Sequence, residues 1–380
     1  MSQGDFVRRM ETGGAAIYGA PNQWQRVHLD VPLFLLLTLL AAAGLFILYS
    51  GSGQSLYYVE HQLLNYGVGC AVMVATAQLP PRLLERWAYI PYVGGILLLI
   101  AVLVFGIGAK GAQRWLEIGG FRFQPSEILK AAVPLMLASY LGGRALPPRF
   151  KHVLFALVFI AIPPALVILQ PDLGTAILIA ASGFFVLFLA GLPKRYLLVA
   201  GLAAMAVLPL MWFYVLHDYQ RQRILTMFNP EADKLGAGWN IIQSTIAIGS
   251  GGVHGKGWML GTQSQLDFLP ESHTDFIIAV LAEEFGLVGV MALMGLYLLI
   301  IFRCIIICLR AQSMFGRLLA GSITLTFFVY VFVNMGMVSG ILPVVGVPLP
   351  LVSYGGTSIV TLMLGFGMLM SVSTEKKRSI

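Results

Sequence analysis

The chain has 380 residues, of which 58% are apolar and only 11% are charged, and its mean hydropathy is +0.83. An average soluble domain is about 25% charged, so these proportions exclude an ordinary soluble globule and, equally, a disordered chain. The net charge of +7 is typical of Lys and Arg at the ends of membrane spans, and we expect no nucleic-acid partner. The scattered Cys70, Cys304 and Cys308 predict neither a disulfide framework nor a zinc site. The composition therefore predicts an all-α integral membrane protein.

Residues 1–30 predict a cytoplasmic N-terminal segment without the features of a cleavable signal peptide. Residues 31–373 then form a single polytopic membrane domain, and residues 374–380 form a cytoplasmic tail. A helix that crosses a membrane needs about 20 mostly apolar residues. On this criterion the sequence predicts about ten transmembrane helices, at residues 31–50, 62–79, 88–108, 125–142, 153–170, 173–191, 196–216, 276–301, 316–338 and 356–373.

The distribution of charges predicts how these spans are oriented. Sixteen of the 24 Lys and Arg residues fall on one side, and the side richer in them is cytoplasmic, so both termini lie in the cytoplasm. Most acidic residues fall at the extracytoplasmic side. The seventh and eighth spans are joined by a long extracytoplasmic loop over residues 217–275, in which Trp239–Ile248 is compatible with a helix. Loops of this length are usually lids or binding loops.

Two polar constellations lie at the outer ends of apolar spans. Glu127 and Lys130 are three residues apart and therefore share one face of the fourth span. They either line a polar cavity or form a structural ion pair, and a buried pair alone does not decide between these. Asp172 follows Pro171 at the start of the sixth span, where it either caps that helix or contributes to a cation or substrate site.

The long loop carries residues suited to an anionic ligand. Arg221 and Arg223 offer the forked donors that bind phosphate, and Lys256 lies in the glycine-rich run 249–257, whose backbone amides can approach anions. These residues predict a phosphate-bearing partner at the outer surface. The alternative is that the arginines lie among lipid headgroups.

The densest group of titratable residues precedes the eighth span. Glu271, His273 and Asp275 lie in the run Leu269–Phe276, and Glu283 and Glu284 follow about 12 Å further along the helix axis. A carboxylate at the mouth of an apolar helix is a stronger base than one in water, so Asp275 is the candidate general base. The alternative is that Thr274 or Asp275 only caps the helix.

These motifs resemble those of the SEDS family, the bacterial shape, elongation, division and sporulation proteins. The resemblance extends over nearly the whole chain, to Tyr354-Gly355-Gly356. It is carried by Phe123-Gln124-Pro125-Ser126-Glu127 with Lys130, Gln170-Pro171-Asp172-Leu173-Gly174-Thr175, Tyr219-Gln220-Arg221-Gln222-Arg223, the Gly249–Gly252 run, Pro270-Glu271-Ser272-His273-Thr274-Asp275-Phe276 and the 343–350 segment. The stretch from Gly255 to Leu266 is similar to the elongation member of the family rather than to the division member.

The resemblance implies an inner-membrane peptidoglycan glycosyltransferase that polymerises lipid II, together with a class B penicillin-binding protein and the elongation machinery. It implies that Asp275 is the essential external aspartate, that Glu127 and Lys130 are the family's charge pair, and that Asp172 is a sensitive acidic position. Glu271 and His273 are expected to support Asp275, whereas Arg221, Arg223 and Lys256 are expected to bind pyrophosphate. The alternatives are a lipid II flippase and a non-catalytic scaffold for the transpeptidase. The sequence leaves open whether a divalent cation, Mg²⁺ or Mn²⁺, bridges Asp275, Glu127 and the pyrophosphate.

Overall fold

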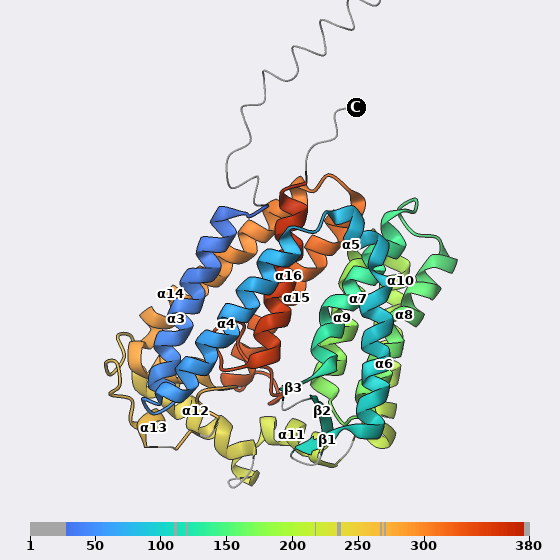
Figure 1. Ribbon diagram of the computed structural model, residues 1–380. Coiled ribbons are helices and arrows are strands. Elements are labelled where there is room, and N and C mark those ends of the chain that lie inside the picture. Colours follow the sequence, from blue (N-terminus) through green and yellow to red (C-terminus); the bar gives the residue numbers. More distant parts are fainter. Residues whose placement is uncertain are drawn as a thin grey trace, which may run out of the picture.

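The computed structural model describes residues 28–109, 112–118, 121–216, 218–233, 237–266, 268–269 and 271–375. It is a helical bundle in which both described ends of the chain lie at the same end (Figure 1). At that end Nδ1 of His28 lies 3.2 Å from Oγ1 of Thr374. Eight of the 24 Lys and Arg residues whose distribution predicts the orientation lie outside the described residues. They are Arg8, Arg9, Arg26, Lys110, Lys234, Lys376, Lys377 and Arg378. The predicted N-terminal segment and tail fall largely outside them too.

A helix occupies each of the ten predicted spans. They are α3 (Val31–Gly51), α4 (Leu56–Ala77), α6 (Tyr89–Phe105), α7 (Pro125–Gly142), α8 (Phe150–Ile168), α9 (Leu173–Leu189), α10 (Lys194–Leu210) with its π-helical extension η1 (Met211–Val215), α14 (Ile277–Arg310), α15 (Met314–Val338) and α16 (Gly356–Ser373). Within the described residues, six helices are long and apolar enough to cross a membrane, and α4 joins them if it is counted with α5 (Pro81–Trp87) across a 99° bend. The helical membrane class is confirmed, and the count of ten spans stays a prediction.

Local sequence signals explain where several helices begin. Asp30 caps α3 by accepting a hydrogen bond from the Leu33 N–H at 3.1 Å, and Ser313 caps α15 through the Gly316 N–H at 3.1 Å. Pro125 stands in the first turn of α7, where its missing N–H leaves no helical hydrogen bond unmade. The pair Pro80-Pro81 separates α4 from α5 because proline disfavours helical backbone in the residue before it.

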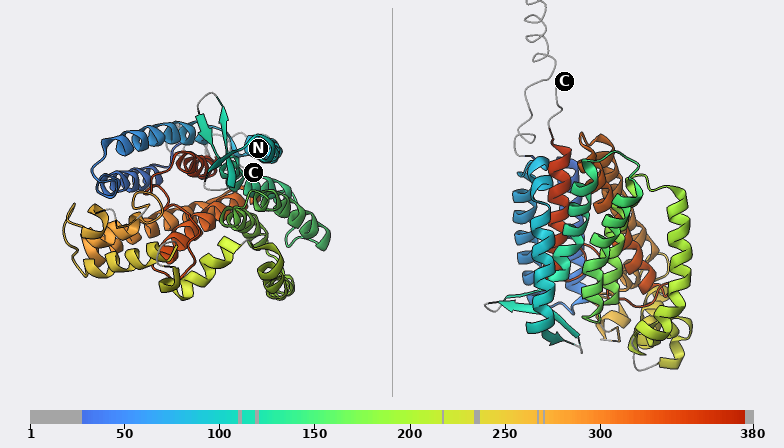
Figure 2. Two further views of the ribbon diagram at one scale, coloured as in Figure 1. Left: turned by 90° about the horizontal axis from the view of Figure 1, so that it is seen from below. Right: turned by 90° about the vertical axis from the view of Figure 1, so that its right-hand side faces the viewer.

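The helices form two packed groups that share α15. One core joins α3, α4, α14, α15 and α16, and the other joins α6, α7, α8 and α9 with the first turns of α15 and with Met368 of α16 (Figure 1). Small residues allow the closest approaches, since a Cβ on Gly367 of α16 would lie 2.5 Å from the Met73 carbonyl oxygen of α4. α10 lies at the edge of the bundle (Figure 2), and none of its apolar window is buried.

The end opposite the two chain ends is built from the connections (Figure 1). The segment between η1 and α14 contains α11 (Asp218–Phe228), η2 (Pro230–Asp233), α12 (Ala237–Gly251) and α13 (Thr262–Gln265). α12 confirms the helix predicted within the long loop. The small antiparallel sheet β1 (Ile107–Ala109), β2 (Ala112–Ile118) and β3 (Phe121–Phe123), in that order, was not predicted. β1 and β3 have three residues each, and the seven residues of β2 do not alternate strictly between apolar and polar.

α14 is interrupted where the sequence predicts a continuous transmembrane helix. Gly286 has φ 62° and ψ −158°, a conformation that only glycine adopts readily. The glycine-rich run of the long loop closes this break, because the Lys256 N–H donates to the Glu283 carbonyl at 3.0 Å and the Leu287 N–H donates to the Gly252 carbonyl at 3.0 Å. The run thus satisfies backbone groups that the interrupted helix leaves free.

Candidate functional site

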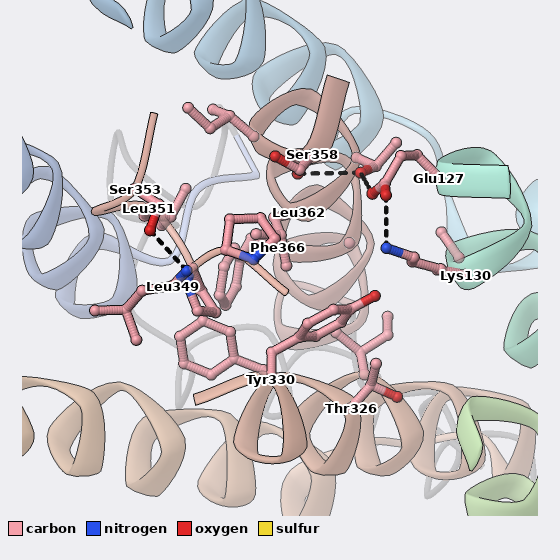
Figure 3. Close-up of a pocket in the computed structure, with 18 residues that line it drawn as sticks. Glu127, Lys130, Thr326, Tyr330, Leu349, Leu351, Ser353, Ser358, Leu362 and Phe366 are labelled. Atoms are coloured by element: carbon pink, nitrogen blue, oxygen red, sulfur yellow. Dashed lines mark hydrogen bonds and ion pairs between the residues drawn. The ribbon is translucent and has the colours of Figure 1, made fainter. Parts of the chain in front are cut away.

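A cavity lies between α7, α15, α16 and the connection from α15 to α16 (residues 339–355). Apolar side chains form most of its wall, and the polar groups converge from three helices (Figure 3). They are Glu127 and Lys130 from α7, Thr326 and Tyr330 from α15, and Ser358 and Thr361 from α16. Such a cavity can hold an amphipathic ligand, since it offers apolar contacts and a few oriented polar groups.

The predicted charge pair lines this cavity (Figure 3). Nζ of Lys130 lies 2.6 Å from Oε1 of Glu127, and the two side chains are 12% and 10% exposed. Thr361 donates a 3.4 Å hydrogen bond to the second carboxylate oxygen, and the ammonium lies 5.1 Å from the ring centre of Tyr330. The ion pair is therefore both a buried brace between α7 and α16 and part of the cavity wall.

Asp172 caps α9, as one of the two sequence interpretations predicts. Its Oδ1 accepts from the Thr175 N–H at 3.2 Å, and its Oδ2 lies 3.3 Å from Nε2 of Gln124 and 3.6 Å from Nε of Arg114. Arg114 also donates to the Pro171 carbonyl at 2.7 Å. These contacts join the sheet, the residue before α7 and the start of α9 at the same end of the molecule. Arg114 was not singled out in the sequence, since its partners lie 57 and 58 residues further along the chain.

Asp275 lies in a turn that ends where α14 begins. Glu271 opens the turn with φ 58°, and its carbonyl accepts from the N–H groups of Thr274 at 3.1 Å and Phe276 at 3.3 Å. Oδ2 of Asp275 faces Gly346, because a Cβ built on Gly346 would lie 3.4 Å from it. The carboxylate thus lies against the α15–α16 connection, whose residues from Pro348 onward line the cavity.

The two neighbours predicted to support Asp275 have separate partners. Oε2 of Glu271 accepts from the Thr274 hydroxyl at 2.7 Å. The His273 carbonyl accepts from the Tyr354 N–H at 2.9 Å, and the His273 ring lies 4.7 Å from that of Tyr58. Burial lowers the pKa of His273, and the negative charge of Glu271 opposes that shift in part. A neutral imidazole at physiological pH follows.

Polar side chains inside the apolar spans hold the α15–α16 connection in place. Nε2 of Gln62 donates to the Ser353 carbonyl at 2.9 Å, and the hydroxyls of Tyr66 and Tyr297 donate to the carbonyls of Leu351 and Pro350 at 2.7 Å each. The fourth such side chain is Asn334 of α15, whose amide donates to two carbonyls near Asp275. None of these four residues was predicted from the sequence. The signal that identifies Gln62 and Asn334 is an amide side chain within an apolar run.

The three basic residues predicted to bind pyrophosphate are divided by the structure. Nη1 of Arg223 donates to the Val344 carbonyl at 3.2 Å, on the connection that also faces Asp275. Arg221 instead contacts Asp218 at 3.4 Å and the Phe213 carbonyl at 3.0 Å. Lys256 forms a 2.7 Å ion pair with Glu283. A pyrophosphate role for these residues stays a prediction, and Arg223 is the one that contacts the α15–α16 connection.

Glu283 and Glu284 belong to the break in α14. Glu283 is fully buried and accepts from the N–H groups of Gln263 at 2.9 Å and Ser264 at 3.1 Å, besides Lys256. Glu284 accepts from the Ser50 hydroxyl and, at 3.1 Å, from the Met259 N–H. Both carboxylates therefore fasten the long loop to the interrupted helix, and neither lines the cavity.

The carboxylates considered for a divalent cation are Asp275, which faces Gly346, and Glu127. Within the part of the chain that the structure describes, no group of three His, Cys, Asp or Glu side chains is placed to hold a metal ion. Glu127 is instead paired with Lys130.

Known proteins share this architecture over nearly the whole chain. The family model for FtsW, RodA and SpoVE, described as a cell cycle protein, matches residues 30–378. The peptidoglycan glycosyltransferase MrdB of Escherichia coli (strain K12) is 55% identical over 360 residues, which are 94% of this chain and 97% of MrdB. The probable peptidoglycan glycosyltransferase FtsW of Geobacter metallireducens is 37% identical over 361 residues, which are 92% of this chain and 95% of that protein.

Solved structures show the same fold. A chain of a peptidoglycan synthase complex that coordinates polymerization and crosslinking superposes with a TM-score of 0.78 at 35% identity, covering 90% of this chain and 97% of that one. The rod shape determining protein RodA of Thermus thermophilus superposes with a TM-score of 0.70 at 30% identity, covering 92% of this chain and 98% of its own. The chain therefore belongs to the FtsW/RodA/SpoVE family, the SEDS family that its motifs resemble.

Proposed function

We propose that this protein is the peptidoglycan glycosyltransferase of cell elongation and that it polymerises lipid II into glycan strands. The observation that carries the proposal is the position of Asp275 and of the Glu127–Lys130 pair relative to one cavity. The carboxylate of Asp275 lies against the connection that lines a largely apolar cavity, and the Glu127–Lys130 pair lies in the wall of that cavity. The 55% identity to MrdB and the family membership support the same activity.

The proposed chemistry uses Asp275 as the general base. Its carboxylate takes the proton of the acceptor 4-hydroxyl as that oxygen attacks the anomeric carbon of the donor. A new C–O glycosidic bond forms, the bond from the anomeric carbon to the pyrophosphate oxygen breaks, and undecaprenyl pyrophosphate leaves with the electron pair. A positioned general base contributes about 10²–10⁴-fold in rate.

Basic groups near the cavity are proposed to offset the charge of the leaving pyrophosphate. Lys130 lies in the cavity wall, where its ammonium contacts Glu127 and lies over the ring of Tyr330. Arg223 contacts the same α15–α16 connection that Asp275 faces. Fixed cations aimed at developing negative charge are a common source of transition-state stabilisation.

The reaction is proposed to take place at the extracytoplasmic face of the inner membrane. Arg303, Arg310 and Arg317 lie in the second half of α14 and the first turn of α15, towards the end where the described chain ends meet (Figure 1). The positive-inside rule makes that end cytoplasmic. The Asp275 turn and the rest of the predicted extracytoplasmic loop 217–275 lie at the opposite end.

The proposed partner is a class B penicillin-binding protein that crosslinks the new glycan within the elongation machinery. The similar chain from a peptidoglycan synthase complex supports a partnership between polymerisation and crosslinking. The exposed apolar faces of α14 and α15, which include Leu298, Leu299, Phe302, Phe328 and Phe332, are the proposed contact surfaces.

Purified protein supplied with labelled lipid II in detergent tests this proposal against a flippase and a scaffold. A polymerase makes long glycan without a membrane to cross, whereas a flippase or a scaffold makes none. The matched control for removal of the Asp275 carboxylate is Glu231→Gln, which removes an exposed carboxylate from η2 and is expected to leave the rate unchanged. Glycan absent from the wild-type reaction, with lipid II moved across liposomes instead, overturns the proposal.

A further inference from the structure

Asn334 is a fully buried amide in the last turns of the apolar helix α15. Its side chain has no exposed surface, and its Nδ2 donates to the Asp275 carbonyl at 2.9 Å and to the Val347 carbonyl at 2.7 Å. A buried polar side chain is destabilising unless its hydrogen bonds compensate for lost hydration. A leucine at the same position would not carry this cost, so the presence of Asn334 needs a specific explanation.

The two acceptors belong to different irregular segments. The Asp275 carbonyl ends the turn before α14, and the Val347 carbonyl stands one residue before Pro348, where the cavity wall begins. Buried carbonyls of irregular segments must find donors outside regular secondary structure. A single nitrogen atom on α15 thus ties the turn that carries Asp275 to the connection that forms the cavity.

The other end of the amide shows which of its groups is in use. Oδ1 of Asn334 is buried and has no hydrogen-bond partner within the described part of the chain. Because both acceptors are carbonyl oxygens, only the NH₂ group can make the observed bonds, which fixes the amide orientation. The position thus retains two donors at the expense of one unmet acceptor.

We propose that Asn334 is a positioning residue for Asp275 and that its amide sets the place of the carboxylate relative to the cavity. This inference rests on the proposed role of Asp275 as general base. Reacting groups must be held within a narrow range of geometries, and a misplacement of about 1 Å can reduce the rate about 10²-fold. Without the amide, the turn that carries Asp275 and the connection lose their common donor, so the position of Asp275 relative to Gly346 is less tightly fixed.

A double-mutant cycle tests the inference. Asn334→Ala is expected to lower the polymerisation kcat about 10- to 100-fold with KM changed less than about 3-fold, since it misplaces the base. In an Asp275→Asn background the same substitution is expected to have no further effect on kcat, because the group that Asn334 positions is already removed. Asn334→Ser, which keeps one hydrogen-bond donor, is expected to give an intermediate kcat. It replaces the alanine variant in the test if that variant does not fold.

The matched control is Ser322→Ala on the same helix. Ser322 is also fully buried, and its hydroxyl donates to the Ser182 carbonyl at 2.7 Å, in a contact between α15 and α9. Its loss is expected to lower the unfolding temperature without lowering kcat. Equal losses of kcat from Asn334→Ala in the wild-type and Asp275→Asn backgrounds overturn the inference and show a structural role. An Asp275→Asn variant with wild-type kcat overturns the general-base assignment itself, and the inference with it.

Discussion

The ion pair between Glu127 and Lys130 gives the most detailed prediction. Lys130→Met leaves a carboxylate that is only 10% exposed without its partner at 2.6 Å, and Glu127→Gln leaves an ammonium that is 12% exposed. Removing one member of a buried pair costs about 3–5 kcal/mol, because an uncompensated charge stays in a poorly hydrated site. Replacing both members removes both charges. The double variant is therefore expected to be less destabilised than the sum of the single variants, by up to about 3 kcal/mol.

Denaturant unfolding of the purified protein in detergent measures these differences, with Asp218→Asn as the control. Asp218 forms a pair of the same spacing with Arg221 on the surface of α11, and its side chain is fully exposed, so its loss should leave the unfolding midpoint unchanged. Additive losses in the double variant would refute the reasoning, since they would show that the two charges are already well hydrated. Polymerisation by the same variants separates the two roles of the pair. A stable double variant without activity assigns the charges to the cavity.

Three further predictions concern other parts of the fold. Burial raises the pKa of Asp30, but hydrogen bonds from Arg303 and other donors outweigh it and hold the pKa below its usual value. Asp30 therefore stabilises the fold above about pH 4, the stabilisation is lost as the pH falls through the lower native pKa, and Asp30→Asn should flatten this acid limb of the unfolding temperature. Gly286→Ala should abolish folded protein in size-exclusion chromatography, because its Cβ would lie 2.4 Å from the Gly255 nitrogen at a φ of 62°. Glu283→Gln should speed proteolysis of the long loop, because it removes the charge from the buried carboxylate that accepts several of the loop's hydrogen bonds, and unchanged cleavage would contradict this role.

Features that depend on neighbours in the sequence could be predicted from it. The ten helical ranges follow from apolar runs of sufficient length. The spacing of Glu127 and Lys130 predicts their contact, and the position of Asp172 after a proline turn predicts its cap on α9. The helix within the long loop was also predicted, because Trp239–Ile248 has the composition of one.

Features that depend on distant partners could not be predicted. Lys256 was expected to bind an anion, but its partner Glu283 lies 27 residues further on and the loop must fold back to reach it. The break at Gly286 depends on the glycine-rich run that fills it. Asn334 acquires its importance from carbonyls 59 and 13 residues away, and no local pattern identifies which carbonyls a buried amide will meet.

The most direct test of the central claim is the rate at which purified Asp275→Asn protein polymerises labelled lipid II in detergent, compared with wild type. Asparagine keeps the size of the side chain and removes its basicity, so the variant should still fold while the rate falls about 10²–10⁴-fold. A folded Asp275→Asn protein that polymerises lipid II at the wild-type rate would contradict the account.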